Sequence, residues 1–177
     1  MSVLNRIPEN TNPIQPTKFL LTFDRIGAVT YFCQTVKLPG VSMGQAPINT
    51  PLLDIQAPGN KLSFNPFSVG FIVDEELIGW RQIYEWFNSM ASPKSLESRR
   101  SLTDIQNEYK SGRSQSYSDA TLTVISALNN PIVRIQFYNV FPVSLSDIDF
   151  DTMQSADNII TAEVSFAYDY FEFLPIN

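Results

Sequence analysis

The feature that most constrains the fold is a long alternation of apolar and polar residues from Ile160 to Tyr170. The apolar and aromatic residues in this stretch stand at every second position: Ile160, Ala162, Val164, Phe166, Tyr168 and Tyr170. Side chains of a β-strand point alternately to opposite faces, so this pattern predicts a strand with one buried and one polar face. We expect it to be the longest strand, at the centre of a sheet.

Other segments predict further strands. The alternation of Phe67, Val69, Phe71 and Val73 indicates a second strand with one buried face. Residues 18–36 are interpreted as a β-hairpin that turns at residues 26–28, and residues 120–138 as another hairpin that turns at residues 129–131. An edge strand is expected at residues 48–55, inside a proline-rich segment, because proline cannot donate to the ladder of a central strand.

One helix is predicted, starting at Asp74 and ending before Ser92-Pro93. Asp74 is suited to cap the amino end of a helix, where its carboxylate can accept hydrogen bonds from free backbone amides. Large apolar residues then recur at helical spacing: Leu77, Trp80, Ile83, Tyr84, Phe87 and Met90. This stripe is typical of a helix packed on a sheet, and no polar groups converge on it to form a cofactor site.

These elements predict a single domain with two polar appendages. Residues 1–16 form a proline-containing arm, residues 17–177 a single β domain, and residues from about 92 to 119 a long polar loop that we expect to be disordered or used for binding. Consecutive strands without strand–helix alternation predict a mostly β fold, an antiparallel β-sandwich or barrel with one flanking α-helix. The first residues lack the apolar centre of a signal peptide, and no apolar run reaches the roughly 20 residues that cross a bilayer, so we expect no membrane insertion.

Composition argues against the common kinds of catalysis. The chain has no histidine and a single cysteine, Cys33, so Ser-His-Asp and Cys-His arrangements and the usual zinc sites are excluded. Cys33 lies in the apolar run TYFCQTV, which is typical of a small core residue rather than a nucleophile. We therefore expect no catalytic residues, no cofactor and no metal.

Charge is unevenly distributed. The net charge is −6, Arg134 is the last basic residue, and only acidic charges follow it. An acidic surface repels phosphate, so tight, sequence-reading binding of nucleic acid is not expected. Weak repulsion would instead suit a wall past which DNA slides.

The stretch DIDFD places Asp147, Asp149 and Asp151 at alternate positions and allows a calcium interpretation. In a calcium-binding loop these would occupy the first, third and fifth positions. The sixth position is then Thr152, where a glycine makes the sharp turn, and the twelfth is Asn158, where a bidentate glutamate belongs. The match fails at both demanding positions.

Two other interpretations of DIDFD remain. Asp149 and Asp151 could act as the carboxylate pair of a hydrolase, because alternate residues on one strand face have a suitable separation, although no second acidic cluster accompanies them. The interpretation we favour is an acidic, solvated strand face, with Ile148 and Phe150 pointing to the opposite side.

Three segments in order resemble the tube proteins of contractile bacteriophage tails. They are TKFLLTFDRIGAVTYFCQTVKLPG, LSFNPFSVGFIVDEELIGWRQIYEWFNSM and NVFPVSLSDIDFDTMQSADNIITAEVSFAYDYFEF. They resemble, respectively, the opening hairpin of those proteins, their strand that leads through an acidic cap into a helix, and their closing strands. Baseplate tube initiators and the tubes of type VI secretion share this fold, so the resemblance includes them.

The resemblance implies a structural role in the virion tail, after assembly in the host cytoplasm. It implies hexameric rings whose strands join into a continuous inner barrel, stacked to form the channel through which DNA leaves. The implied partners are other copies of the chain, the tail sheath, baseplate or tail-terminator proteins, and DNA in passage. We expect the tube subunit itself, because the additional terminal regions of the initiators are not found here, with the initiator as the alternative.

Overall fold

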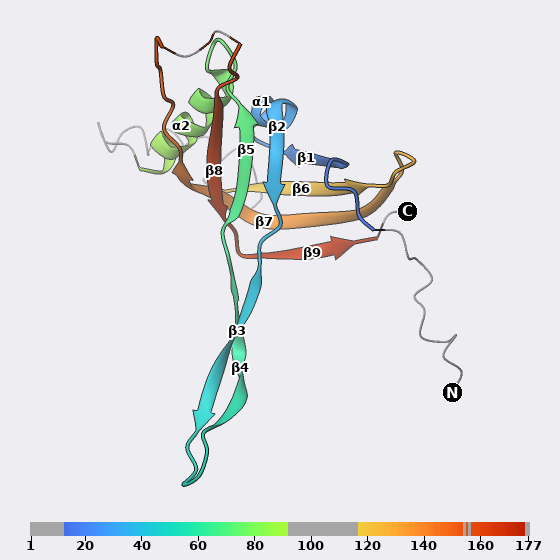
Figure 1. Cartoon of the computed structure of the whole chain (residues 1–177), viewed down its shortest axis with the longest axis vertical. Coiled ribbons are helices and arrows are strands. Elements are labelled where there is room, and N and C mark those ends of the chain that lie inside the picture. The colour runs from blue at the N-terminus through green and yellow to red at the C-terminus, as the bar shows by residue number, and fades with distance from the viewer. Residues whose placement is uncertain (1–12, 92–116, 154, 156, 176–177) are drawn as a thin grey trace, which may run out of the picture.

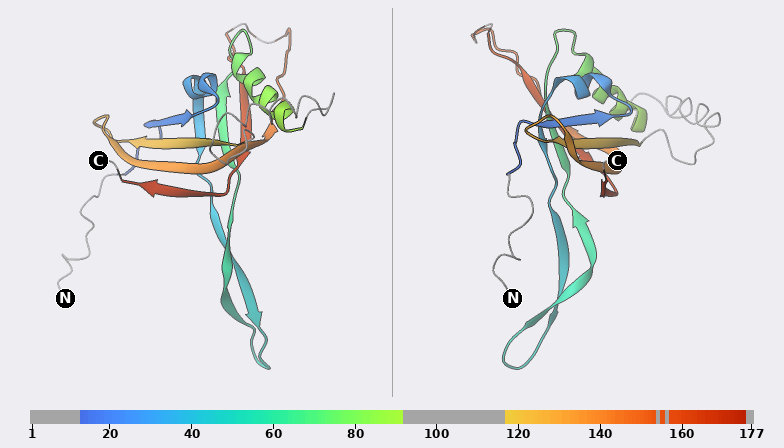
Figure 2. Two further views of the ribbon diagram at one scale, coloured as in Figure 1. Left: turned by 180° about the vertical axis from the view of Figure 1, so that it is seen from behind. Right: turned by 90° about the vertical axis from the view of Figure 1, so that its right-hand side faces the viewer.

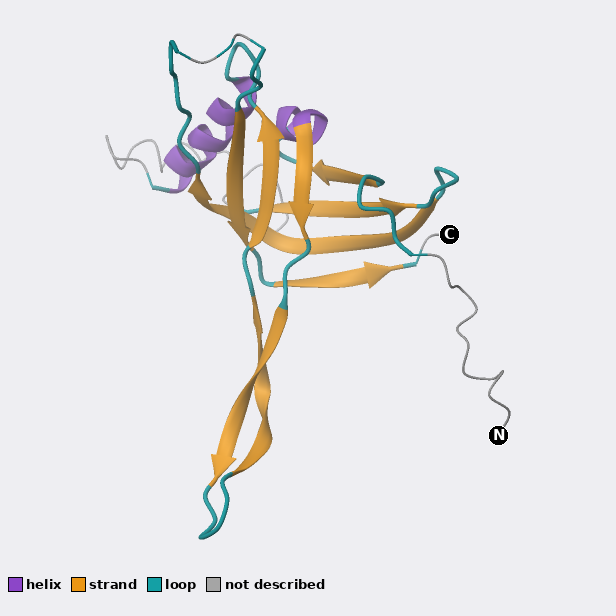
Figure 3. Cartoon of the chain, in the orientation of Figure 1, coloured by secondary structure: helices purple, strands orange, loops and turns teal. Residues whose placement is uncertain are grey.

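The computed structural model describes residues 13–91, 117–153, 155 and 157–175, and its described part is mostly β-structure (Figures 1 and 3). The elements are β1 (Phe19–Phe23), α1 (Gly27–Phe32), β2 (Cys33–Lys37), β3 (Val41–Ile48), β4 (Ile55–Phe64), β5 (Phe67–Ile72), α2 (Ile78–Met90), β6 (Ser118–Ile125), β7 (Pro131–Leu145), β8 (Thr161–Ala167) and β9 (Tyr170–Leu174). The predicted fold class, antiparallel β-structure with few helices, is confirmed.

The long strand β7 joins two groups of strands that run crosswise to each other (Figure 1). Its first part pairs with β6 and β9, and β6 pairs in turn with β1; we call this group sheet A. Its last part pairs with β8, followed by β5 and β2; we call this group sheet B. At the bend, Asn139 has a φ of 56°, which asparagine tolerates, and its backbone N–H donates to Asp119 Oδ1 at 3.2 Å.

The predicted alternation places β8 inside sheet B, between β5 and β7. Its apolar residues are buried and stand opposite buried residues of β5, in the pairs Ala162–Phe71, Val164–Val69 and Phe166–Phe67. The central position of the strand is therefore confirmed. Its expected length is wrong, because β8 ends at Ala167, Tyr170 belongs to β9, and β7 is longer.

The predicted hairpin over residues 18–36 is wrong. Residues Gly27–Phe32 form helix α1, β1 pairs with β6, and β2 pairs with β5. Tertiary packing overrides the β-propensity of this segment: Val29 is fully buried and faces Gly79 of α2. Thr30 Oγ1 also donates to the carbonyl of Ile26 and accepts from the N–H of Phe23, each at 3.2 Å.

The hairpin over residues 120–138 is confirmed as β6 and β7, which turn through residues 126–130. A second hairpin, β3–β4, occupies residues 41–64, and the edge strand predicted at residues 48–55 is in fact its tip. Figure 1 shows this hairpin as an arm that extends away from the body. Gly59 lies so close to the carbonyl oxygen of Gly44 that any side chain would collide with it, so the two strands of the arm approach closely there.

Helix α2 begins later than predicted, and its predicted apolar stripe is confirmed in part: Ile83 is buried, and Trp80, Phe87 and Met90 pack partly buried against the core. The carboxylate of Asp74 accepts hydrogen bonds from the N–H groups of Ile78 at 2.8 Å and Gly79 at 3.1 Å, so Asp74 caps the helix although it precedes its first turn. The fully buried residues are Gly79, Ile83 and Trp86. Tyr84, expected in the buried stripe, is 47% exposed.

Both helices pack on the core face of sheet B, as the right-hand view of Figure 2 shows. The aromatic ring of Trp86 lies 6.0 Å from that of Phe166 in β8, and Gly79 approaches Phe71 in β5. Neither described helix is long and apolar enough to cross a membrane. The arm predicted at residues 1–16 and the loop predicted at about 92–119 lie largely outside the described residues, and Ser118 and Asp119 already belong to β6.

Candidate functional site

The DIDFD stretch lies in the connection between β7 and β8 and is not a strand, so the predicted acidic strand face is wrong. The last residue pair between the two strands is Leu145–Val164. After it the chain leaves the sheet, and the three aspartates are exposed. Phe150 is 77% exposed while Ile148 is partly buried, so the two apolar residues do not share a buried side as they would in a strand.

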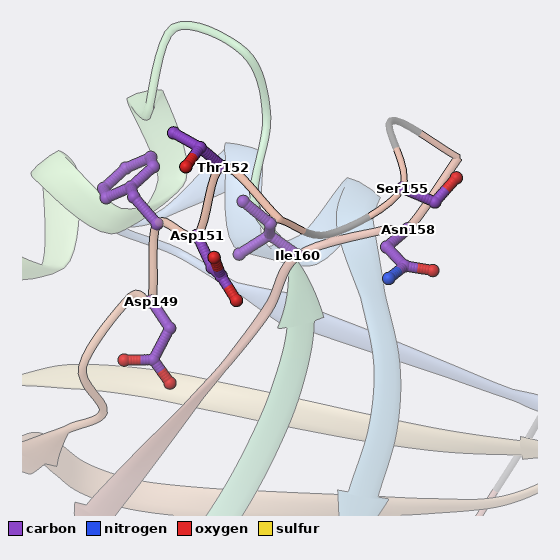
Figure 4. Close-up of a pocket in the computed structure, with 7 residues that line it drawn as sticks. Asp149, Asp151, Thr152, Ser155, Asn158 and Ile160 are labelled. Carbon is purple, nitrogen blue, oxygen red and sulfur yellow. The ribbon is translucent and has the colours of Figure 1, made fainter.

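The stretch instead contributes to an open hollow of about 360 Å³ (Figure 4). Its lining residues are Asp149, Phe150, Asp151, Thr152, Ser155, Asn158 and Ile160. Asp151 Oδ1 accepts a local hydrogen bond from the N–H of Met153 at 2.9 Å, as in an Asx turn. In Figure 4, Ser155 and Asn158 lie away from the two aspartates, with Ile160 between them, so the polar groups do not converge.

This hollow supports neither the calcium-binding loop nor the hydrolase carboxylate pair considered for DIDFD. Within the described residues, no group of three or more histidine, cysteine or acidic side chains is placed to hold a metal ion. A glycosidase also needs one carboxylic acid whose pKa is raised by burial, whereas Asp149 and Asp151 are both exposed.

Cys33 is half-buried at the start of β2 and packs against the core. Burial raises the pKa of its thiol to about 11, an effect larger than the opposing influence of a hydrogen bond with the backbone of Thr35. The thiol is therefore protonated at neutral pH, as suits a packed residue rather than a nucleophile.

A second surface is the face of sheet B opposite the core. The helices and the buried aromatic residues occupy the other face, so the described elements leave this one uncovered (Figure 2). Beside the apolar Ile72, which stands opposite Thr161, most residues along it are small and carry hydroxyl groups: Thr35, Ser68, Gly70, Ser144, Thr161 and Ser165. Ser68 and Ser165 share a hydrogen bond between their hydroxyls at 3.2 Å.

One ion pair spans this polar face. Lys37 Nζ lies 2.9 Å from Glu163 Oε1, and both side chains are largely exposed. Lys37 stands opposite Ser68, and Glu163 stands opposite Gly70, so the two small residues of β5 leave room for the pair to reach across the strand. Asp147 lies in the same hollow of about 430 Å³ as the ion pair.

The sheets end in strands without a further partner among the described residues. In sheet B the end strand is β2, and in sheet A the end strands are β1 and β9. Unpaired backbone N–H and C=O groups at such edges can pair with another chain. These edges are therefore available for pairing with a strand of another chain.

Comparisons with known proteins find a sequence family, a sequence relative and solved structures of similar fold. The sequence model of a family described as phage tail tube protein matches residues 14–174. The tail tube terminator protein of Enterobacteria phage T4 is 27% identical over 168 residues, which cover 91% of this chain and 89% of that protein.

Two solved structures share the fold at low sequence identity. The tube-terminating cap of the anti-feeding prophage matches with a TM-score of 0.65 at 14% identity, over 99% of this chain and 100% of that one. A chain of the six-fold symmetrised baseplate of the anti-feeding prophage matches with a TM-score of 0.58 at 13% identity, over 94% of this chain and 98% of that one.

Proposed function

The chain belongs to the phage tail tube protein family, and we propose that within this family it is a tube terminator, a structural ring that closes the tail tube. Its place is the virion tail. The observation that carries the proposal is the match to the T4 tail tube terminator, which spans 91% of this chain and 89% of that protein. The likeness of the fold to a tube-terminating cap agrees with it.

A ring of identical subunits suits the shape of this protomer. Joining sheet B of one copy to a neighbouring copy would continue the sheet beyond β2 and remove the free edge there. The bulk of the protomer, with both helices, would then lie outside the closed sheet, and the polar face would line a channel for DNA. Six copies are proposed, and a six-fold symmetrised assembly among the structures of similar fold supports that number.

The β3–β4 arm adds a second reason to expect self-association. It carries large apolar residues that are exposed in the protomer: Val41, Met43, Ile48, Leu52, Leu53, Ile55 and Leu62. An isolated two-stranded hairpin is marginally stable in water, so contact with another subunit of the assembly would stabilise it. Tail sheath and neighbouring tube or baseplate proteins are the further partners proposed.

Two other roles in the tail remain as alternatives. The family description supports the tube subunit itself, and the baseplate chain of similar fold supports the tube initiator. The related proteins are structural, which supports a role without catalysis, and a hydrolase working through Asp149 and Asp151 finds no support among them.

Electron microscopy of the purified full chain, alone and with growing tubes of the cognate tube protein, separates these roles. A terminator is expected to form rings that do not elongate by themselves and that stop growth when they bind a tube end. Long tubes from the chain alone would identify the tube subunit, and rings that start tube growth would identify the initiator. A monomer that neither forms rings nor binds tube ends would contradict all three.

A further inference from the structure

The strands that form the polar face of sheet B carry very little charge. Among the residues of β2, β5, β8 and the part of β7 after its bend, Lys37 is the basic residue and Glu163 the acidic one. They pair with each other at 2.9 Å. Most of the other residues of this face are small and carry hydroxyl groups, and Ile72, opposite Thr161, is apolar. None of these groups binds a DNA phosphate as strongly as a free ammonium group does.

The position of the pair matters because Lys37 is well placed to bind a phosphate. Its side chain is 71% exposed, on a face that no described element covers. In a closed ring every copy would contribute one such lysine at the same height of the channel, and the contributions of several cations to DNA binding multiply. A ring of free lysines would therefore hold the DNA that the channel must release.

We infer that Glu163 masks Lys37, so that DNA passing the polar face of sheet B meets no unpaired cation there. The inference rests on the proposed channel. It assigns Glu163 the role of neutralising the charge of Lys37 toward DNA, which is distinct from stabilising the fold. Asp147, in the same hollow, adds a negative charge beside the pair and acts in the same direction. An exposed ion pair contributes little to stability, so Glu163 can be replaced without unfolding the chain.

The test compares the DNA affinity of the full-length wild-type chain with that of Glu163→Gln. The probe is a short, labelled, blunt-ended DNA duplex at low ionic strength, and the readout is fluorescence anisotropy. Glu163→Gln frees Lys37 and is expected to bind the duplex about tenfold more tightly than wild type, with a steeper loss of affinity as salt is added. The double variant Lys37→Gln/Glu163→Gln is expected to return to the wild-type affinity.

A matched control lies on helix α2, which packs against the other face of sheet B. Glu85 pairs with Arg81 at 3.5 Å, and both side chains are exposed to a similar degree as those of the Lys37–Glu163 pair. Glu85→Gln makes the same change of charge on the outside of the proposed ring. Its affinity for the DNA duplex is therefore expected to rise much less than that of Glu163→Gln. The inference is overturned if Glu163→Gln binds like wild type, if Glu85→Gln gains as much, or if the double variant keeps the gain.

Ring formation is recorded separately by electron microscopy of the same samples. If Glu163 masks Lys37, Glu163→Gln binds the DNA duplex more tightly than Glu85→Gln does, whether the chain forms rings or remains a single protomer. Absence of rings together with failure to bind tube ends would therefore contradict the proposed function while leaving the masking result intact, and absence of the affinity difference in well-formed rings would contradict masking alone.

Discussion

Gly70 shows how a single residue shapes the polar face of sheet B. A Cβ atom at this position would collide with Thr35 Oγ1 on the neighbouring strand, whereas its distance to Thr35 Cβ would be an ordinary 3.7 Å. The obstacle is therefore one hydroxyl group of a cross-strand partner. Space beside Thr35, and not backbone conformation, therefore favours glycine at this position.

Gly70→Ala is expected to lower the free energy of unfolding by about 1–3 kcal/mol, as overpacking typically does. Replacing Thr35 by alanine in the same chain removes the colliding hydroxyl, so the double variant is expected to recover most of that loss. Urea denaturation of the four chains of this double-mutant cycle measures the effect. Equal losses with and without Thr35 would show that the collision is not the cause.

Tyr168 is a second residue with a local physical consequence. Its ring lies in an aromatic cluster, 5.2 Å from Phe137 and 5.9 Å from Phe64, and its hydroxyl is buried without a hydrogen-bond partner among the described residues. Burial raises the pKa of this hydroxyl from 10.0 to about 12. The folded chain therefore retains this proton at pH values where the unfolded chain has released it.

Tyr168→Phe is expected to be at least as stable as wild type at pH 7, because it removes an unsatisfied buried hydroxyl. The sign of the pH effect follows from the raised pKa: stability contributed by Tyr168 is present below pH 10 and declines as the pH rises towards about 12. The difference between the two chains should thus grow in favour of Tyr168→Phe over that range. Thermal unfolding at several alkaline pH values tests this, and parallel curves would contradict it.

At the scale of elements, the start of α2 depends on Asp74. Partial desolvation raises the pKa of this carboxyl, but hydrogen bonds from the backbone N–H groups of Ile78 and Gly79 outweigh it, so the net effect is a lowered pKa. Stability from the cap is thus present above the ordinary aspartate pKa of about 3.9 and is lost as the pH falls through the lowered value.

Asp74→Ala is expected to lower the free energy of unfolding by about 1 kcal/mol at pH 7, the usual effect of losing a helix cap. The gap between the variant and wild type should close in acid as wild-type Asp74 becomes protonated. Glu75→Ala is a suitable control, because this neighbouring acid is exposed and makes no described cap. A gap that stays constant down to the acid limit would exclude the capping role.

The β3–β4 arm and the body are expected to differ in local stability. Strand β8 is flanked by β5 and β7 and has three buried apolar residues, whereas no residue of β3 is buried. Backbone amides of the arm should exchange hydrogen through local opening and those of β8 only near global unfolding. Hydrogen exchange of the unassembled chain, monitored by mass spectrometry, measures this difference. Equal protection of the amides in the arm and in β8 would contradict the lower local stability of the arm.

At the scale of the whole molecule, sequence patterns predicted the strands that are buried on one side. Phe67–Ile72 and β8 were found because their apolar residues alternate and the core selects that alternation. The β6–β7 hairpin was found because a turn sequence separates two strand-like runs. The mostly β architecture and the family followed from the order of these segments.

The errors have a common physical origin in tertiary context. Residues 27–32 are rich in strand-forming types but form α1, because Val29 packs against α2. The DIDFD stretch alternates like a strand, yet it has no neighbouring strand to pair with and leaves Phe150 exposed. The Lys37–Glu163 pair joins residues far apart in the sequence, so only the register of β2, β5 and β8 reveals it.

The proposed assembly is a closed ring of copies of this chain, with the polar face of sheet B lining the channel. Single-particle cryo-electron microscopy of the assembled full-length chain tests it most directly. We expect closed rings in which sheet B continues from one copy to the next and Lys37 and Glu163 lie on the inner wall. Rings lined by another surface, or a chain that stays monomeric at every concentration, would contradict it.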